Sequence, residues 1–237
     1  MQLLARLPPS VFECLPDRVK DGRALVLRRH RAQGRLFFVQ IGSNDGVRRD
    51  PIHRFVMRHG WAGILVEPVP EVYSRLVANY RANPHLVFEN LAIAERPGRA
   101  GFYSLRPGSG TLPEWHDQVG SLLPETLLRY RPWIPDVENR IVRDEVQAIT
   151  YAELMRRHGE PLVDFLHIDT EGYDFRIIRS LDLSRHRPRM ILYENVIMSQ
   201  WERVQCMELL GRGGYRLIIQ GADTFAYLSP GAGTGAE

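Results

Sequence analysis

The sequence lacks several features that mark particular classes of protein. Cysteine occurs only twice, as Cys14 and Cys206, far apart and without metal-ligand spacing. Free thiols in a reducing compartment are the favoured interpretation, and a single disulfide stays the alternative. No apolar run reaches the roughly 18 residues that cross a bilayer. Two prolines and an arginine interrupt the start of the chain, where a signal peptide needs a continuous apolar centre. These absences favour a cytoplasmic protein with no membrane contact.

Basic charge is present but weak, because the net charge of the chain is only +3. The only lysine is Lys20, and the densest basic cluster, in residues 25–31, has no aromatic side chains within it. A nucleic-acid platform interleaves basic and aromatic residues, so we interpret this cluster as a solvated helix face. We therefore expect a small-molecule partner and no nucleic acid, and we leave homo-oligomerisation open.

The apolar pattern alternates between strand and helix through most of the 237 residues. Buried strands followed by helices at this spacing predict right-handed βαβ crossovers, which build a mostly parallel sheet with helices on both faces. The last two apolar runs, on either side of a turn at 221–223, predict an antiparallel C-terminal hairpin. Strands are predicted at 35–41, 62–68, 85–93, 139–149 and 187–196; helices at 50–60, 71–83, 150–159 and 199–214; and a strand, an acidic turn and a helix within 161–181.

The middle of the chain breaks this alternation. Residues 104–140 are rich in proline, glycine and aromatic side chains and show no clean period. A plain connector of this length is uncommon in a compact domain, so we predict a lid insertion there. The predicted organisation is one α/β domain over residues 1–237, with a helical lead-in at 1–35, the lid at 104–140 and a disordered tail at 230–237.

The turn after the first predicted strand is the most informative stretch. Gly42 and Gly46 let the backbone approach a ligand, and Glu67 ends the next strand about 20 residues later, the spacing at which a carboxylate reaches a ribose. A dinucleotide site would need G-x-G-x-x-G, whereas this turn presents Asp45, which would repel phosphates. The sulfonium and amino groups of S-adenosylmethionine suit Asp45 better. A structural turn capped by Asp45 stays the alternative.

Four stretches resemble one known family. FVQIGSNDG, ILVEPVP, the segment 90–94 and DFLHIDTEGYD are similar to motifs of the FkbM family of S-adenosylmethionine-dependent methyltransferases, over most of residues 36–220. The resemblance implies the class I methyltransferase (Rossmann-like) fold and O-methylation of a sugar, polyketide or glycolipid hydroxyl, in natural-product or glycan biosynthesis. The chain departs from the family at Gln40, where many members carry an acid. The cofactor-binding positions that the resemblance implies are Gly42, Asn44, Asp45, Gly46, Glu67, Asn90, Ala92 and Ser121.

Acidic residues at the third strand end are the candidates for the chemistry. Methyl transfer to an alcohol must align the oxygen with the sulfonium methyl and weaken the O–H bond. Asp169 and His167 share one face of their strand, and Glu171 follows in the turn, so these three are the candidate catalytic residues. The alternatives are a hydrogen-bonded core histidine for His167 and a helix-start acid for Glu171.

A metal ion offers a second way to weaken the O–H bond. If the next strand lies alongside, Asp169, Glu194 and Asn195 would meet as three oxygen ligands of the kind that Mg²⁺ prefers. This arrangement is similar to that of metal-dependent small-molecule O-methyltransferases. The lid adds Trp115, Tyr130 and Trp133, which would stack on a sugar ring or an apolar polyketide, or hold the lid down as a hydrophobic cluster.

Three functions compete at this point. The leading hypothesis is an S-adenosylmethionine-dependent O-methyltransferase of a sugar, glycoside or polyketide-type small molecule. A dehydrogenase with an NAD-type cofactor is disfavoured by Asp45 and by the missing third glycine. A non-catalytic cofactor-binding partner in a biosynthetic complex is disfavoured by the retained acids Asp45, Glu67, Asp169 and Glu194.

Overall fold

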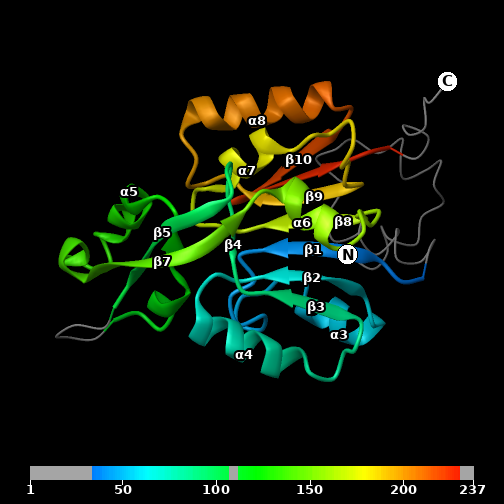
Figure 1. Cartoon of the computed structure of the whole chain (residues 1–237). Helices are drawn as coiled ribbons and strands as arrows, with labels where there is room; N and C mark the ends of the chain where they lie inside the picture. Colours follow the sequence, from blue (N-terminus) through cyan, green and yellow to red (C-terminus); the bar gives the residue numbers. More distant parts are fainter. Residues whose placement is uncertain (1–33, 107–111, 230–237) are drawn as a thin grey trace.

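The computed structural model of the chain describes residues 34–106 and 112–229. The predicted lead-in helix, Cys14 and the predicted tail lie outside these residues. Within them, one large sheet forms the centre, and a smaller lobe projects beyond the carboxyl ends of its strands (Figure 1).

The main sheet has seven strands in the described part of the chain, in the order β10-β11-β9-β8-β1-β2-β3. The five strands from β9 to β3 pair in parallel, whereas β11 is antiparallel to both β9 and β10. This is the predicted mostly parallel sheet with an antiparallel C-terminal hairpin. The strands are β1 (Phe37–Ile41), β2 (Ala62–Val66), β3 (Leu86–Glu89), β8 (Phe165–Ile168), β9 (Met190–Glu194), β10 (Arg216–Gln220) and β11 (Asp223–Tyr227).

The helices begin and end at residues with clear local causes. Gly60, in the left-handed conformation with φ 58°, caps the end of α3. The Thr150 side chain accepts a hydrogen bond from the backbone N–H of Glu153 and so caps the start of α6. Ser199 and Glu202 form a capping box on α8. The helices are α3 (His53–His59), α4 (Pro70–Tyr80), α6 (Tyr151–Arg157), α7 (Asp174–Ser180) and α8 (Gln200–Arg212).

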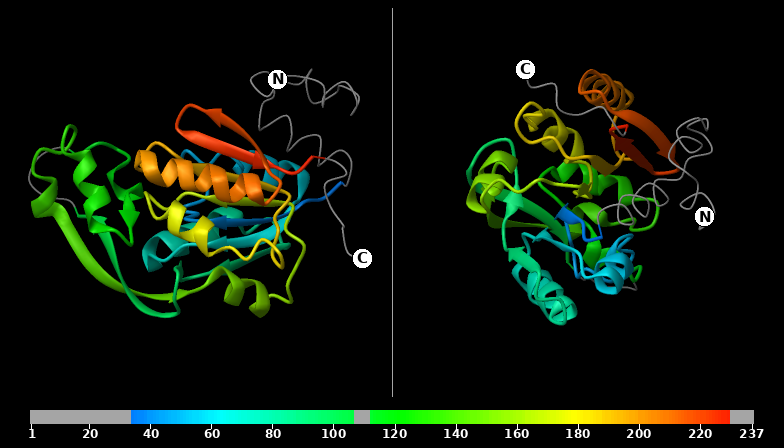
Figure 2. Two further views of the ribbon diagram at one scale, coloured as in Figure 1. Left: turned by 90° about the horizontal axis from the view of Figure 1, so that it is seen from above. Right: turned by 90° about the vertical axis from the view of Figure 1, so that its right-hand side faces the viewer.

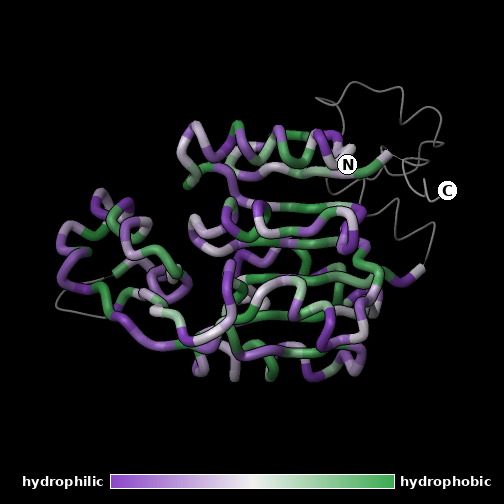
Figure 3. The backbone as a smooth tube through the Cα atoms, turned by 45° about the horizontal axis from the view of Figure 1, so that its top comes forward, coloured by the Kyte–Doolittle hydropathy of each residue, from purple (hydrophilic) through white to green (hydrophobic). Residues whose placement is uncertain are grey.

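Two apolar layers hold helices against the main sheet. Successive residues of β1 point to opposite faces, so Phe38 packs with α3 and α4, and Val39 packs with α6, α7 and α8. Much of the hydrophobic colouring in Figure 3 lies in the strands of the main sheet. Burying each such side chain stabilises the fold by about 1.5–3 kcal/mol. Within the described residues, no helix has the length and apolar character needed to span a membrane.

The predicted third strand, 85–93, forms two strands in two different sheets. β3 stays in the main sheet, but the chain turns away at Asn90, whose side-chain amide donates to the carbonyls of Glu67 and Pro68 at 2.9 and 3.1 Å. After Leu91, the residues Ala92 and Ile93 join a second sheet, of order β4-β7-β5-β6. Its strands are β4 (Ala92–Ile93), β5 (Gly98–Leu105), β6 (Gly120–Ser121) and β7 (Ile141–Ile149).

The predicted lid, residues 104–140 and hereafter the insertion, connects β5 to β7 in this second sheet. Its described part contains short helices and has its own apolar cluster, which includes Val119, Leu127 and Ile134. The left view of Figure 2 shows it as a lobe beside the end of the main sheet. Its elements are η3 (His116–Gln118), β6, α5 (Pro124–Leu127), η4 (Leu128–Tyr130) and η5 (Val137–Arg140).

Candidate cofactor and active site

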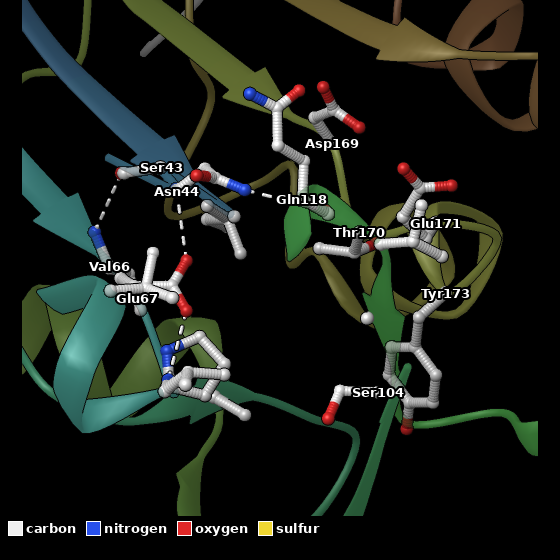
Figure 4. A pocket seen from close by; sticks show the side chains of 18 of the residues that line it. Ser43, Asn44, Val66, Glu67, Ser104, Gln118, Asp169, Thr170, Glu171 and Tyr173 are labelled. Carbon is white, nitrogen blue, oxygen red and sulfur yellow. Dashed lines mark hydrogen bonds between the residues drawn. The ribbon is translucent and has the colours of Figure 1, made fainter. Parts of the chain in front are cut away.

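A cavity of about 680 Å³ lies between the carboxyl ends of the main strands and the insertion. Parallel sheets bind ligands at this edge, because loops diverge there and leave a crevice. Figure 4 shows Glu67 on one side of the cavity and Asp169 and Glu171 on the other. The cavity therefore spans both of the strand ends at which the sequence places cofactor and chemistry.

Glu67 is held rigidly at the end of β2. Its two carboxylate oxygens accept the backbone N–H groups of Asn44 and Val69, each at 2.9 Å. Burial raises the pKa of Glu67 to about 7, against the lowering effect of those two hydrogen bonds. Each oxygen keeps a further lone pair, so the carboxylate can still accept hydrogen bonds from a ligand in the cavity.

The turn after β1 is held closely against its neighbouring strands. The Ser43 hydroxyl donates to the Gln40 carbonyl and accepts the Val66 N–H, both at 3.1 Å. Gly42 has φ 80°, and a Cβ at this position would lie 1.8 Å from the carbonyl oxygen of Asp169. Glycine at position 42 therefore lets the turn approach the end of β8, in addition to lining the cavity.

Asp45 and Gly46 do not line the cavity, contrary to the cofactor-binding role predicted for them. The Asp45 carboxylate accepts the N–H groups of Val47 and Arg48 and pairs with the Arg48 guanidinium at 2.6 Å. Burial alone would raise the pKa of Asp45, but the hydrogen bonds from Arg48 and Val47 outweigh it and lower the pKa. Gly46 is needed for packing, since a Cβ there would lie 2.3 Å from the Tyr80 ring.

The other predicted cofactor residues divide into lining and supporting groups. Ala92 and Asn44 line the cavity, and Asn44 adopts φ 47°. Asn90 instead holds the turn behind Glu67, as described above. Ser121 is buried and donates to the Thr170 carbonyl at 3.3 Å, so it attaches the insertion to the end of β8.

The ends of β8 and β9 bring several carboxylates together. Asp169, Glu171 and Glu194 line the cavity, and Asp174 lies buried behind them, where it accepts the Thr170 hydroxyl at 2.8 Å and the Glu194 N–H at 3.3 Å. Asp169 opens on the cavity, but burial of its carboxyl group raises its pKa well above the usual value. The negative charges of Glu171, Asp174 and Glu194 raise this pKa further. Burial likewise raises the pKa of Glu194 to about 8.

Glu171 receives a partner from the insertion. The Tyr130 hydroxyl lies 2.6 Å from Glu171 Oε2, and Glu171 adopts φ 51°, which is unusual for a residue other than glycine. Burial raises the pKa of Glu171 to about 7, while the hydrogen bond from Tyr130 lowers it. A carboxyl group with a pKa near neutrality is suited to moving a proton at physiological pH.

His167 lines the cavity but is buried and already bonded. Its Nδ1 lies 3.2 Å from Gln40 Nε2, and because an amide nitrogen can only donate, Nδ1 accepts. Burial lowers the pKa of His167 to about 4, so the ring is neutral and weakly basic. This environment fits the core alternative better than the predicted role as general base.

The predicted Mg²⁺ ligands do not converge. Asn195 is buried outside the cavity lining, and its side-chain amide donates to Thr224 Oγ1 at 2.9 Å. Among the described residues, no group of three or more histidine, cysteine, aspartate or glutamate side chains could hold a metal ion. The donor set of Asp169, Glu194 and Asn195 therefore does not fit a metal site, and we route no step through one.

The insertion also brings to the cavity residues that had no predicted role. Arg48, next to the first turn, donates to both carboxylate oxygens of Asp117 at 3.0 and 2.8 Å. Asn44 donates to the Gln118 carbonyl at 3.4 Å. The predicted aromatic residues Trp115, Tyr130 and Trp133 also line the cavity, and the Trp115 and Tyr130 rings lie 5.1 Å apart.

Comparison with solved structures finds methyltransferases among the similar folds. Methyltransferase FkbM from Methylobacillus flagellatus KT is 10% identical, with a TM-score of 0.49, over 93% of this chain and 50% of that one. Precorrin-6y C5,15-methyltransferase from Geobacter metallireducens GS-15 is 13% identical, with a TM-score of 0.41, over 86% of each chain. The Methanococcus jannaschii fibrillarin pre-rRNA processing protein is 9% identical, with a TM-score of 0.41, over 83% of this chain and 67% of that one.

The chain thus spans half the length of the first of these structures. A search of curated proteins finds no match. The order of the strands in the main sheet is that of the class I methyltransferase fold, as the family resemblance implies. The model of the methyltransferase FkbM domain matches residues 40–217, and because this match covers well over half of the chain, the protein belongs to the FkbM methyltransferase family.

Proposed function

We propose that the protein is an O-methyltransferase that transfers a methyl group from S-adenosylmethionine to a hydroxyl of a sugar, glycoside or polyketide-type small molecule. The observation that carries the proposal is the single cavity that joins Glu67 to the carboxylates of Asp169 and Glu171 beneath the aromatic side chains of the insertion. Family membership implies the cofactor. The hydroxyl acceptor and the residue roles are part of the proposal.

The residues around Glu67 fit an adenosine-containing cofactor. Backbone N–H groups fix both oxygens of Glu67 and leave lone pairs for two neighbouring ribose hydroxyls. Ala92 lines the cavity beside it, and its small side chain leaves room for a flat base. These residues would hold the adenosine portion, and the carboxylates at the ends of β8 and β9 would face the reacting end.

When bound, the cofactor supplies an electrophilic methyl group on a positively charged sulfur. The chain must then orient the acceptor oxygen and take up its proton. Asp169 and Glu171 face the cavity with raised pKa values, so we assign proton acceptance to these two carboxylates. His167 is not assigned this role, because its Nδ1 is already used and its pKa is low.

The aromatic residues of the insertion support a ring-bearing acceptor. Trp133 is 63% exposed, although it is large and apolar, and it packs edge-on against Trp115 at 6.4 Å. Exposed indole rings beside carboxylates offer an apolar surface for the C–H face of a ring and acceptors for its hydroxyl groups. A glycoside or cyclic polyketide would satisfy both.

The direct test is transfer of labelled methyl from S-adenosylmethionine to a panel of glycosides, polyketides and amines, followed by location of the label by mass spectrometry. Asp169→Asn should reduce transfer by at least about 100-fold while leaving the fold and cofactor binding intact. Asp144→Asn, on the exposed part of β7, is the matched control. Label on nitrogen, or full activity in Asp169→Asn, would contradict the proposal; cofactor binding without transfer to any acceptor would favour a non-catalytic partner.

A further inference from the structure

One positive side chain on the cavity wall takes part in no ion pair within the described part of the chain. The arginines of this part that line the cavity are Arg48, Arg49 and Arg75. Arg48 and Arg75 both pair with Asp117 of the insertion, at 2.8 and 3.6 Å. The Arg49 side chain, in contrast, forms neither an ion pair nor a hydrogen bond with any residue of 34–106 or 112–229. Its guanidinium carries five N–H donors, which are therefore available to a ligand.

The backbone on both sides of Arg49 is held in place. The Asp45 carboxylate accepts the N–H groups of the two preceding residues, and Asp50 accepts two N–H groups at the start of α3. Arg49 itself has φ 58°, a left-handed conformation that residues other than glycine seldom adopt. Strained residues of this kind persist where the surrounding structure fixes them, often at ligand sites. The side chain thus starts from a fixed point on the cavity wall.

Arg49 lies toward the acceptor end of the cavity rather than the adenosine end. Burial raises the pKa of Glu171 to about 7, and the positive charge of Arg49 is one of the influences that lower it. Burial also raises the pKa of Glu67 to about 7, but the arginine whose charge counters this rise is Arg75. Because interactions between charges weaken with distance, Arg49 is the arginine close to Glu171. Glu171 also contacts Tyr130 of the insertion, one of the rings proposed to bind the acceptor.

A positive charge at this end of the cavity would allow an acidic acceptor to bind. Asp169, Glu171 and Glu194 line the cavity here, so a negative group would be repelled without a nearby cation. Burial raises the pKa of Glu171 to about 7 and that of Glu194 to about 8, so both are partly protonated near neutral pH and repel less.

The guanidinium of Arg49 is suited to one kind of acidic group in particular. An arginine forms two parallel hydrogen bonds with a carboxylate or a phosphate, a geometry that a neutral hydroxyl does not match. A phosphate ester carries between one and two negative charges near neutral pH, whereas a carboxylate carries one. Beside the carboxylates of Asp169 and Glu171, the carboxylate is therefore the less strongly repelled of the two.

We propose that Arg49 binds a carboxylate on the methyl acceptor, so that the acceptor is a glycoside or polyketide-type molecule with an acidic group. The inference rests on the proposed methyltransferase function and narrows its substrate class. Arg49 determines specificity here: it holds the acceptor and takes no part in the proton transfer assigned to Asp169 and Glu171.

Two probes that differ in one group test this assignment. Phenyl β-D-glucuronide carries a carboxylate where phenyl β-D-glucoside carries a hydroxymethyl group. Calorimetry measures the binding of each probe to the protein saturated with S-adenosylhomocysteine. The glucuronide should bind about tenfold or more tightly, as expected for hydrogen bonds between charged groups. This comparison uses the unaltered protein, so it does not depend on a variant folding. Equal affinities, or no binding of either probe, would overturn the assignment.

Arg49→Gln removes the charge and keeps an unbranched polar side chain. It should weaken the glucuronide by about tenfold or more and leave the affinities for the glucoside and for S-adenosylhomocysteine unchanged. Arg58→Gln, exposed on α3 and outside the cavity lining, is the matched control and should change none of the three affinities. A folded Arg49→Gln that keeps its affinity for the glucuronide would overturn the assignment. A variant that loses affinity for S-adenosylhomocysteine alone would also overturn it, because the guanidinium would then serve the carboxylate of the cofactor.

Failure of this assignment can be told apart from failure of the proposed function. If the unaltered protein does not bind S-adenosylhomocysteine, the proposed function fails and the assignment fails with it. If the protein binds S-adenosylhomocysteine and methylates neutral hydroxyl acceptors without preferring the acidic probe, only the role of Arg49 fails.

Discussion

The hydroxyl of Tyr130 lies 2.6 Å from the carboxylate of Glu171 and joins the insertion to the end of β8. Burial and the nearby Glu171 carboxylate raise the pKa of Tyr130 above its usual value, so the hydroxyl keeps its proton and donates. The contact brings a residue from the irregular middle of the chain to one of the two carboxylates proposed to accept a proton. The insertion is therefore part of the proposed active site as well as its cover.

Tyr130→Phe removes this hydrogen bond while keeping the ring against Trp115. We expect methyl transfer to fall about tenfold and the free energy of unfolding to fall by about 1 kcal/mol, because one hydrogen bond to a carboxylate is lost. Cofactor affinity should stay unchanged, since Glu67 is not affected. Steady-state kinetics, denaturant unfolding and calorimetry measure the three quantities.

Tyr103→Phe is the matched control for this change. Tyr103 lies on β5 of the same second sheet and does not line the cavity. Loss of the same hydroxyl there should alter neither transfer nor cofactor affinity. If the two variants behave alike, the Tyr130 hydroxyl does not act through Glu171.

Local sequence signals predicted the fold and one side of the site well. The alternation of strands and helices depends on local apolar patterns, and the structure confirms it. The helix ends at Gly60 and Thr150 likewise have causes within a few residues of sequence. Glu67 lies on the cavity wall because the strand that carries it ends there. The ion pair of Asp45 with Arg48 could not be predicted, because an arginine three residues away can equally extend into solvent.

The insertion side of the site could not be predicted in the same way. Tyr130 is 41 residues from Glu171, and Asp117 is 69 residues from Arg48. Such contacts depend on how β5 and β7 pair and leave no periodic pattern in the sequence. The break at Asn90 is similar: an apolar run predicts one strand, and only the hydrogen bonds to Glu67 and Pro68 show that the chain changes sheets.

Removal of divalent metal should leave activity unchanged. Asn195 is turned toward Thr224, so the chain does not provide the three oxygen ligands that the sequence suggested. We expect protein treated with EDTA and then desalted to keep its full rate of methyl transfer, and added Mg²⁺ to give no increase. A rate that falls with EDTA and returns with Mg²⁺ would restore the metal hypothesis.

Asp117→Asn should speed release of the cofactor. Arg48 pairs with Asp117 in the insertion and with Asp45 in the first turn, so the two ion pairs connect the insertion to the turn beside the cavity. Partly exposed pairs contribute about 0.2–1 kcal/mol. This corresponds to dissociation of S-adenosylhomocysteine that is faster by a factor of about 1.4 to 5, measured by stopped-flow displacement. Glu145→Gln removes the exposed pair with Arg99, away from the cavity, and should leave the rate unchanged; equal rates in all three proteins would show that the pair does not retain the cofactor.

Glu67→Gln should change the pH dependence of both stability and cofactor binding. Burial raises the pKa of Glu67 from 4.5 to about 7 in the folded protein. Between these values the unfolded chain loses a proton that the folded chain keeps, so this group lowers the free energy of unfolding as pH rises, by up to about 3 kcal/mol. Glutamine removes that loss, and the stability of the variant relative to the unaltered protein should therefore increase from pH 4.5 to pH 8.

Cofactor affinity should respond in the opposite sense. The ionised Glu67 carboxylate is the stronger acceptor for ribose hydroxyls, so affinity of the unaltered protein for S-adenosylhomocysteine should rise between pH 6 and pH 8. Glu67→Gln should bind about tenfold more weakly at pH 8 and show little of this rise. Thermal unfolding and calorimetry at each pH supply both measurements. An unchanged affinity in the variant would remove Glu67 from the cofactor site, because its carboxylate would then be only a cap for Asn44 and Val69.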